Sequence, residues 1–194
     1  MLKNCTLIAT LPNLNRIDKV KEILKNQNIC GARFNTGVNC LMNIPEVIYT
    51  LKELSNMYGK PIWIDIKGRQ LRITKWADPS YEAIELNHNV EIVYPAKIYF
   101  RNGTSTDIVR TKGNKIIVDP IPKSAVGAGQ SVNIIAKDLE ILGYLTESDK
   151  EYLQSCNEIG MNNIMASFVE SESDIKEIIK YLPNANITSK IESL

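Results

Sequence analysis

Short apolar segments alternate with amphipathic segments through most of this 194-residue chain. Short apolar runs bounded by turn residues predict strands, whereas apolar residues spaced three and four apart predict helices. The expected strands span residues 5–11, 29–34, 61–66, 163–169 and 186–192, and the expected helices span 15–27, 45–59, 146–160 and 171–183. Strands that alternate with helices usually form a parallel sheet with right-handed crossovers. The pattern fits either a doubly wound α/β sheet or a (β/α)-barrel.

The alternation is interrupted once, between residues 71 and 137. Helical spacing disappears there, and turn signals at Asn102-Gly103 and Gly113-Asn114 separate short β-type runs. These runs span residues 90–94, 97–100, 107–110, 115–118 and 131–135. We therefore expect an all-β domain at 71–137, inserted into a discontinuous α/β domain formed by 1–70 and 138–194.

The charge of the chain is balanced, with 23 basic and 22 acidic residues. A balanced charge creates no overall field that would attract nucleic acid or an anionic membrane, so we expect neither as a partner. The sequence shows no signal peptide, and no apolar run approaches the length that crosses a bilayer. A cytoplasmic location is the expectation.

Cysteine and histidine provide few catalytic groups. The four cysteines show no C-x-x-C spacing and lie mostly in apolar segments, so we expect buried free thiols rather than zinc ligands or disulfides. The single histidine, His88, lies in a polar turn. Catalysis that depends on histidine is therefore not expected.

Polar side chains gather at the carboxyl ends of four expected strands. They are Arg33, Asn35, Asp65, Lys67, Ser167, Lys190 and Glu192. Ligand sites of α/β-barrels are built at this end of the strands, so residues far apart in sequence would converge there. Lys190 and Glu192 are two positions apart and share one face of an extended strand. Taken alone they could be a solvent-facing ion pair, but their convergence with the other strand ends favours a site for phosphate and metal chemistry.

Six motifs at these strand ends resemble, in the same order, motifs of pyruvate kinase. They are residues 6–12, 31–35, 65–72, 145–149, 166–169 and 190–192. The β insertion follows the third motif, as it does in that family. The resemblance implies an α/β fold with a parallel (β/α)8-type barrel, here incomplete with about five βα units, and a small all-β barrel as a lid.

The resemblance also implies a reaction, the transfer of a phosphoryl group between phosphoenolpyruvate and ADP to give pyruvate and ATP. Lys190 would be the catalytic residue that stabilises the charge in transfer, and Arg33 would hold the phosphate. Ser167 and Lys67 would contact the substrate, and Arg72 would contact the nucleotide.

The same resemblance implies two metal cofactors. Glu192 would bind Mg²⁺ or Mn²⁺, and Asn35 and Asp65 would be ligands of K⁺. The chain departs from the family at several positions. Among them, Ile66 replaces a threonine, and Thr36-Gly37 replaces a longer segment with a histidine.

These departures support an alternative, a catalytically degenerate module that binds a phosphorylated metabolite or a partner chain. Metal-dependent aldolases and lyases are a third possibility and the least favoured, because they lack the β insertion at this position. An incomplete barrel leaves two sheet edges unpaired. We therefore expect a homo-oligomer or a part of a longer chain.

Overall fold

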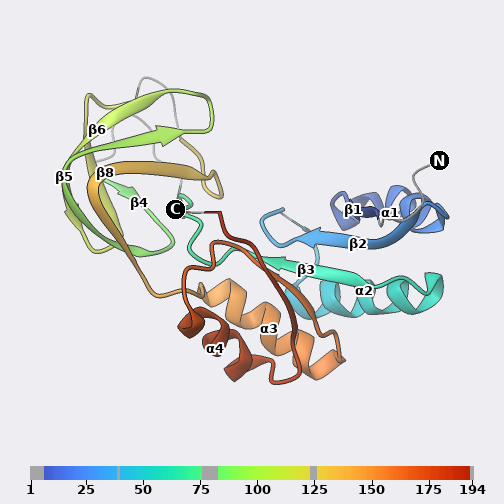
Figure 1. The fold of residues 1–194 in the computed structure, drawn as a ribbon. Helices are drawn as coiled ribbons and strands as arrows, with labels where there is room; N and C mark the ends of the chain where they lie inside the picture. Colours follow the sequence, from blue (N-terminus) through green and yellow to red (C-terminus); the bar gives the residue numbers. More distant parts are fainter. Residues whose placement is uncertain (1–6, 39, 76–82, 123–125, 193–194) are drawn as a thin grey trace. The chain divides into compact units, whose positions relative to one another are not determined.

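The computed structural model describes residues 7–38, 40–75, 83–122 and 126–192. The chain divides into two compact units (Figure 1). The α/β unit comprises Met1–Gly68 and Glu147–Leu194, and the β unit comprises Arg69–Thr146. The expected boundary at residue 137 lies inside a strand of the β unit, which continues to Leu142.

The α/β unit contains one five-stranded parallel sheet with the order β1-β2-β3-β9-β10. Its strands are β1 (Leu7–Thr10), β2 (Ile29–Asn35), β3 (Ile62–Ile66), β9 (Asn163–Ala166) and β10 (Asn186–Ser189). Its helices are the 3₁₀ turn η1 (Leu14–Arg16), α1 (Ile17–Lys25), α2 (Ile44–Tyr58), α3 (Glu147–Ile159) and α4 (Glu172–Tyr181). Strand neighbours in the sheet follow their order along the chain within this unit.

The expected fold, an incomplete (β/α)8-type barrel, is wrong. A barrel must close by pairing its first and last strands, whereas here β1 and β10 are the two edges of an open sheet. Only five parallel strands and four α-helices are found in the part of the chain that the structure describes. The fold is a mixed α/β arrangement of one parallel sheet and a separate antiparallel sheet. The alternation of strands and helices is the same in open sheets and barrels, so the sequence pattern could not separate them.

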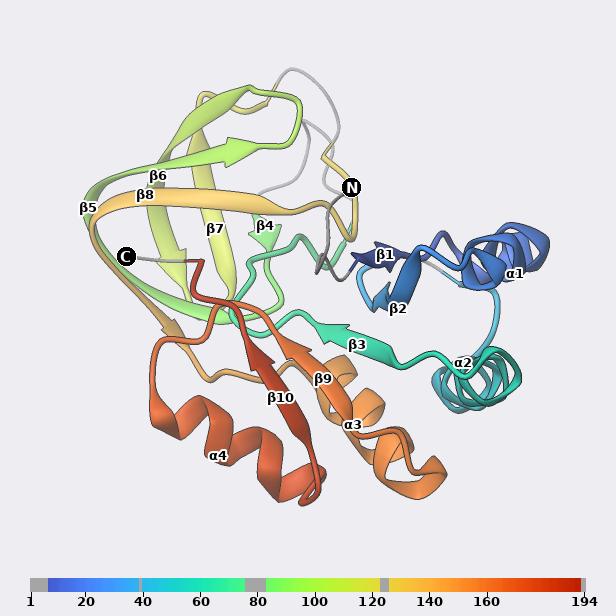
Figure 2. The same ribbon diagram turned by 45° about the vertical axis from the view of Figure 1, so that its right-hand side comes forward.

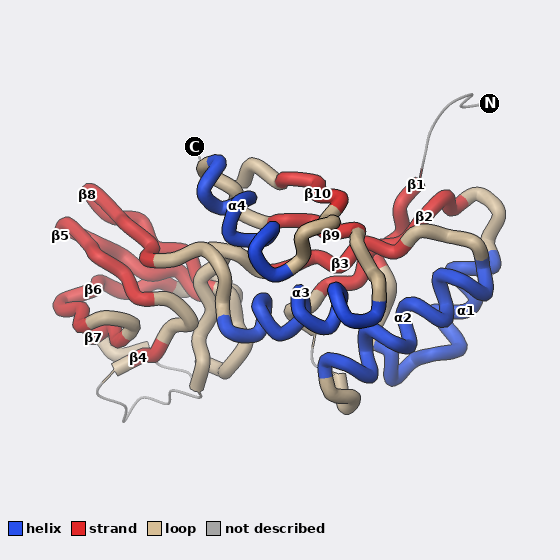
Figure 3. Tube along the Cα trace, turned by 90° about the horizontal axis from the view of Figure 1, so that it is seen from below, coloured by secondary structure: helices blue, strands red, loops and turns tan. Residues whose placement is uncertain are grey.

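Local sequence signals explain where the helices begin. Asn43 caps α2 by accepting a hydrogen bond from the Glu46 amide at 2.9 Å, and the Glu46 carboxylate accepts one from the Asn43 amide at 3.1 Å. Ser171 and Asp174 form the corresponding capping box of α4. Consecutive helices pack against each other, α1 with α2, α2 with α3, and α3 with α4 (Figure 3). The helices also pack against the sheet, with contacts between α1 and β2 and between α2 and β3.

The core of the α/β unit consists of aliphatic side chains from the sheet and the helices. Those without exposed surface include Val20, Leu24, Ile48, Leu51, Ile64, Ile66, Leu153, Ile164 and Ile178. The apolar stripes of α1, α2 and α3 contribute Leu24, Leu51 and Leu153. Burial of these stripes is the main stabilising term of such a layer.

The β unit is an antiparallel sheet with the order β4-β7-β6-β5-β8 (Figure 2). Its strands are β4 (Ile84–Glu85), β5 (Asn89–Phe100), β6 (Ser105–Lys112), β7 (Lys115–Asp119) and β8 (Val132–Leu142). The strand β8 pairs with β5 along nearly its whole length, and Leu139 and Ile141 pack against the core of this unit. Polar and apolar residues alternate over 138–141, a strand signal that the expected boundary at 137 overlooked.

The cysteines differ in part from the expectation. Cys30, Cys40 and Cys156 are free thiols, but only Cys156 is buried, and Cys30 is exposed on β2. Burial raises the pKa of the Cys156 thiol to about 12. Cys5 lies outside the described residues.

Among the helices that the structure describes, none has the length and apolar character needed to cross a bilayer.

Candidate functional site

Parallel pairing brings polar residues together at the carboxyl ends of the strands in the α/β unit. On neighbouring strands Thr10 pairs with Arg33, and Asn35 pairs with Asp65. Ser167 and Lys190 come directly after the last residues of β9 and β10. These residues therefore lie along one edge of the parallel sheet.

The centre of the cluster is the carboxylate of Asp65, which is only 3% exposed. Arg33 donates from Nε and Nη2 to Asp65 Oδ2. Lys190 Nζ lies 3.0 Å from Oδ1 and 3.3 Å from Oδ2 of the same carboxylate. Ser167 Oγ donates to Oδ1 at 3.0 Å. Three strands thus place two cations and a hydroxyl around one buried anion.

This pairing explains how an ionised aspartate can be buried. An unpaired buried carboxylate is strongly unfavourable, and it is tolerated when opposite charges and hydrogen bonds surround it. The side chains of Arg33 and Lys190 remain 29% and 27% exposed, respectively. Both cations are therefore held by the buried Asp65 carboxylate, and a part of each side chain remains exposed to solvent.

Backbone hydrogen bonds continue past the strand ends and fix the residues of the cluster. The Lys190 amide donates to the Ala166 carbonyl at 2.8 Å, and the Val169 amide donates to the Lys190 carbonyl at 3.1 Å. The Asp65 carbonyl accepts from the Thr36 hydroxyl at 2.9 Å. Asp65 and Lys190 are 125 positions apart in sequence. The pairing of β3 with β9 and of β9 with β10 brings them into contact.

Glu192 lies at the outer side of the cluster. Its Oε2 is 3.5 Å from Lys190 Nζ and accepts a hydrogen bond from the Phe168 amide at 3.2 Å. Its side chain is 38% exposed. Lys190 therefore bridges one buried and one exposed carboxylate.

The residues present do not fit the expected metal ions well. Two carboxylates lie beside Lys190, but Asp65 is held by two cations, which leaves Glu192 as the one carboxylate available to a metal ion. No group of three or more potential metal ligands occurs among the described residues. A lone carboxylate is too little to hold Mg²⁺ without ligands from a substrate. The two expected K⁺ ligands are engaged elsewhere: Asp65 is paired with two cations, and Asn35 Oδ1 accepts from the Gly37 amide at 2.9 Å. The requirement for Mg²⁺ and K⁺ stays a prediction.

Two other predicted residues lie outside these contacts. The amides of Lys67 and Gly68 donate to the buried carboxylate of Asp149 at 2.9 and 3.2 Å, which fixes the loop after β3. Arg72 belongs to the β unit, where its guanidinium donates to Gln70 Oε1 and to the Gly129 carbonyl. Their proposed contacts with substrate and nucleotide stay predictions.

Three residues of this framework received no role in the site from the sequence. Thr10 Oγ1 accepts from Arg33 Nη1 at 3.1 Å, Thr36 binds the Asp65 carbonyl, and Asp149 holds the loop after β3. Thr10 is the last residue of β1, so the strand-end rule that singled out the other residues could have found it. Asp149 lies in the first turn of α3, where an acidic residue is normally interpreted as favourable to the helix itself.

A scan against protein-family models found no match for the chain, and a search of curated proteins found none either. The resemblance to pyruvate kinase therefore stays a hypothesis based on the strand-end motifs.

Proposed function

We propose that the Asp65 cluster, defined as Arg33, Asp65, Ser167, Lys190 and Glu192, binds phosphoenolpyruvate and supports pyruvate-kinase-type phosphoryl transfer to ADP. The observation that carries this proposal is the convergence of Arg33 and Lys190 on one buried carboxylate at the carboxyl edge of the sheet. A planar guanidinium and an ammonium are the groups that proteins use most for phosphate.

Arg33 retains N–H donors for a ligand in this arrangement, and Lys190 contributes its positive charge. A guanidinium has five N–H donors, and the contacts with Asp65 and Thr10 involve Nε, Nη1 and Nη2 once each. The ammonium of Lys190 has three donors and contacts Asp65 and Glu192. Asp65 thus acts as a positioning residue, which fixes two head groups while a phosphate approaches from the solvent side.

In the proposed reaction the bond between phosphorus and the enol oxygen breaks, and a bond to a terminal phosphate oxygen of ADP forms. The enolate that leaves takes up a proton and becomes pyruvate. Negative charge moves across the phosphoryl group during this step, and preorganised cations stabilise it there. Lys190 and Arg33 would supply that stabilisation.

A second candidate function is binding of a phosphorylated metabolite without turnover. The observation that favours it is the engagement of Asp65 by two cations, which leaves Glu192 as the one other carboxylate beside Lys190. Such a site would hold a phosphate but would lack the protein ligands of a catalytic metal ion.

The test is formation of pyruvate from phosphoenolpyruvate in the presence and absence of ADP and Mg²⁺. We expect ADP-dependent turnover that Lys190→Met abolishes and Lys150→Met preserves. Lys150 is a matched control because its side chain has the same exposed fraction, 27%, and pairs with a carboxylate on α3. Binding of phosphoenolpyruvate without turnover would support the second function. The absence of both binding and turnover would refute both functions.

We also infer a cytoplasmic location, because three described cysteines are free thiols and thiols persist in reducing compartments. Homo-oligomerisation stays a prediction, and the mass of the native protein in solution tests it.

A further inference from the structure

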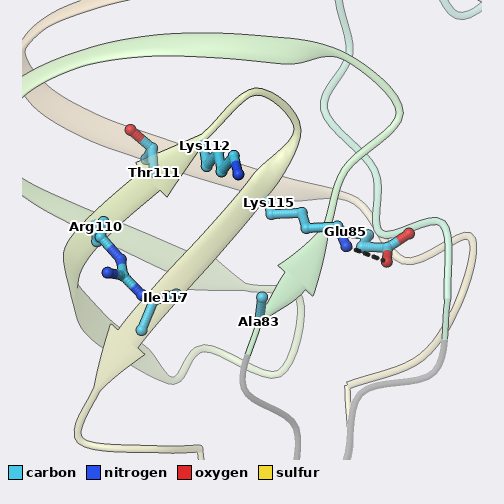
Figure 4. A pocket seen from close by; sticks show the side chains of 7 residues that line it. All are labelled: Ala83, Glu85, Arg110, Thr111, Lys112, Lys115 and Ile117. Carbon is cyan, nitrogen blue, oxygen red and sulfur yellow. Dashed lines mark ion pairs between the residues drawn. The ribbon is translucent and has the colours of Figure 1, made fainter.

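The β unit contains a pocket of about 580 Å³ beside the hairpin formed by β6 and β7 (Figure 4). It is lined by Ala83, Glu85, Arg110, Thr111, Lys112, Lys115 and Ile117. Its volume is in the range of pockets that bind small molecules. Three of its seven lining residues are cations and one is an anion, so an excess of positive charge faces the space.

The hairpin places two lysines directly opposite each other. Lys112 pairs with Lys115 across the two-residue turn between the strands, and Arg110, two positions before Lys112 on β6, pairs with Ile117. Like charges at directly opposite positions of an antiparallel pair are destabilising. The arrangement therefore costs stability in the absence of an anion.

Glu85 compensates only part of this charge. Its carboxylate lies 3.5 Å from Lys115 Nζ and 2.9 Å from Lys75 Nζ, and these two lysines hold the pKa of Glu85 below its usual value. No ion pair involves Arg110 or Lys112 in the part of the chain that the structure describes. Both side chains line the pocket, and both belong to exposed residues. In the pocket, Glu85 therefore compensates the charge of Lys115, whereas the charges of Arg110 and Lys112 have no acidic partner among the described residues.

We propose that this hairpin pocket binds the phosphate group of a small phosphorylated metabolite through Arg110 and Lys112. The guanidinium fork of Arg110 suits two phosphate oxygens, and Lys112 supplies a second charge. Ile117 and Ala83 provide an apolar surface for the carbon part of the ligand. The site is additional to the Asp65 cluster, because no residue is shared between them.

A nucleic acid is the less favoured occupant. Residues 69–146 include ten basic and eight acidic side chains, so the β unit lacks the extended positive surface that a long polyanion requires. A bounded pocket with a local excess of charge instead suits a compact anion.

The experiment uses the full chain and inorganic pyrophosphate as the probe. Binding is measured by calorimetry and located by shifts of backbone amide resonances. We expect shifts at Thr111, Lys112, Lys115 and Ile117, and we expect Arg110→Gln with Lys112→Gln to weaken binding at least about tenfold. A matched variant, Arg101→Gln with Lys137→Gln, removes the same charge from exposed positions of the same unit and should change affinity less than about twofold.

Three results with pyrophosphate as the probe would overturn the proposal. They are no binding of pyrophosphate at millimolar concentration, equal weakening by the two double variants, and shifts confined to the residues around Asp65. Binding of a single-stranded oligonucleotide far more tightly than pyrophosphate through Arg110 and Lys112 would also overturn it. Because Lys190 is outside this pocket, Lys190→Met should leave the shifts at the hairpin unchanged, which separates this test from that of the proposed phosphotransferase.

Discussion

Replacement of Asp65 by asparagine should destabilise the α/β unit, because it removes the anion that holds Arg33 and Lys190. Loss of one partner of a fully buried ion pair costs about 3–5 kcal/mol. Here both cations are more than a quarter exposed, so water can solvate them after the change and the cost is lower. Asparagine also keeps an oxygen that can accept from Ser167. We therefore expect a loss of about 2 kcal/mol in the free energy of unfolding.

The assay is urea unfolding followed by the fluorescence of Trp63 on β3, in a Trp76→Phe background that leaves this single tryptophan in the chain. With a urea dependence of about 2 kcal/mol per molar, the midpoint should fall by about 1 M. Combination with Lys190→Met should reveal a coupling energy of at least about 0.5 kcal/mol, because the two side chains are in contact.

The control for this measurement is Glu151→Gln, an exposed carboxylate on α3. It should change stability by less than about 0.5 kcal/mol. An effect of Asp65→Asn as mild as that of this control, or one that simply added to that of Lys190→Met, would show that Asp65 does not hold the two cations.

Two further predictions concern packing and thiol reactivity in the α/β unit. A methyl group added in Gly31→Ala would lie 2.6 Å from a ring carbon of Trp63 and 3.0 Å from the Pro61 carbonyl oxygen, so overpacking should cost about 1–3 kcal/mol in urea unfolding; an unchanged midpoint would contradict this contact. Burial disfavours the thiolate of Cys156, so iodoacetamide at neutral pH should modify the exposed Cys30 well before Cys156, as read by peptide mass spectrometry. Equal rates for the two thiols in the folded protein would contradict the burial of Cys156.

The secondary structure could be predicted from the sequence where the spacing of apolar residues was regular. The expected strands at 29–34, 61–66, 163–169 and 186–192 overlap β2, β3, β9 and β10, and the capping residues Ser171 and Asp174 mark the start of α4. The order and closure of the sheet were not accessible in the same way. Local periodicity reports which face of each element is apolar, and this is the same for an open sheet and a barrel.

The candidate site shows the same division between local and non-local information. The strand-end rule selected Arg33, Asp65, Ser167 and Lys190, and these side chains do contact each other. The motif resemblance gave Asp65 the role of a K⁺ ligand, whereas the structure surrounds it with two cations. Which partners a side chain meets across 125 positions of sequence depends on register and geometry. No local pattern encodes that.

The most direct test of the central claim is calorimetric binding of phosphoenolpyruvate to the wild-type chain and to the Lys190→Met and Lys150→Met variants. If the Asp65 cluster holds the phosphate, Lys150→Met should bind like the wild type, and Lys190→Met should bind at least about tenfold more weakly. Equal affinities of all three proteins, or no binding to the wild type, would contradict the assignment of this cluster as a phosphate site.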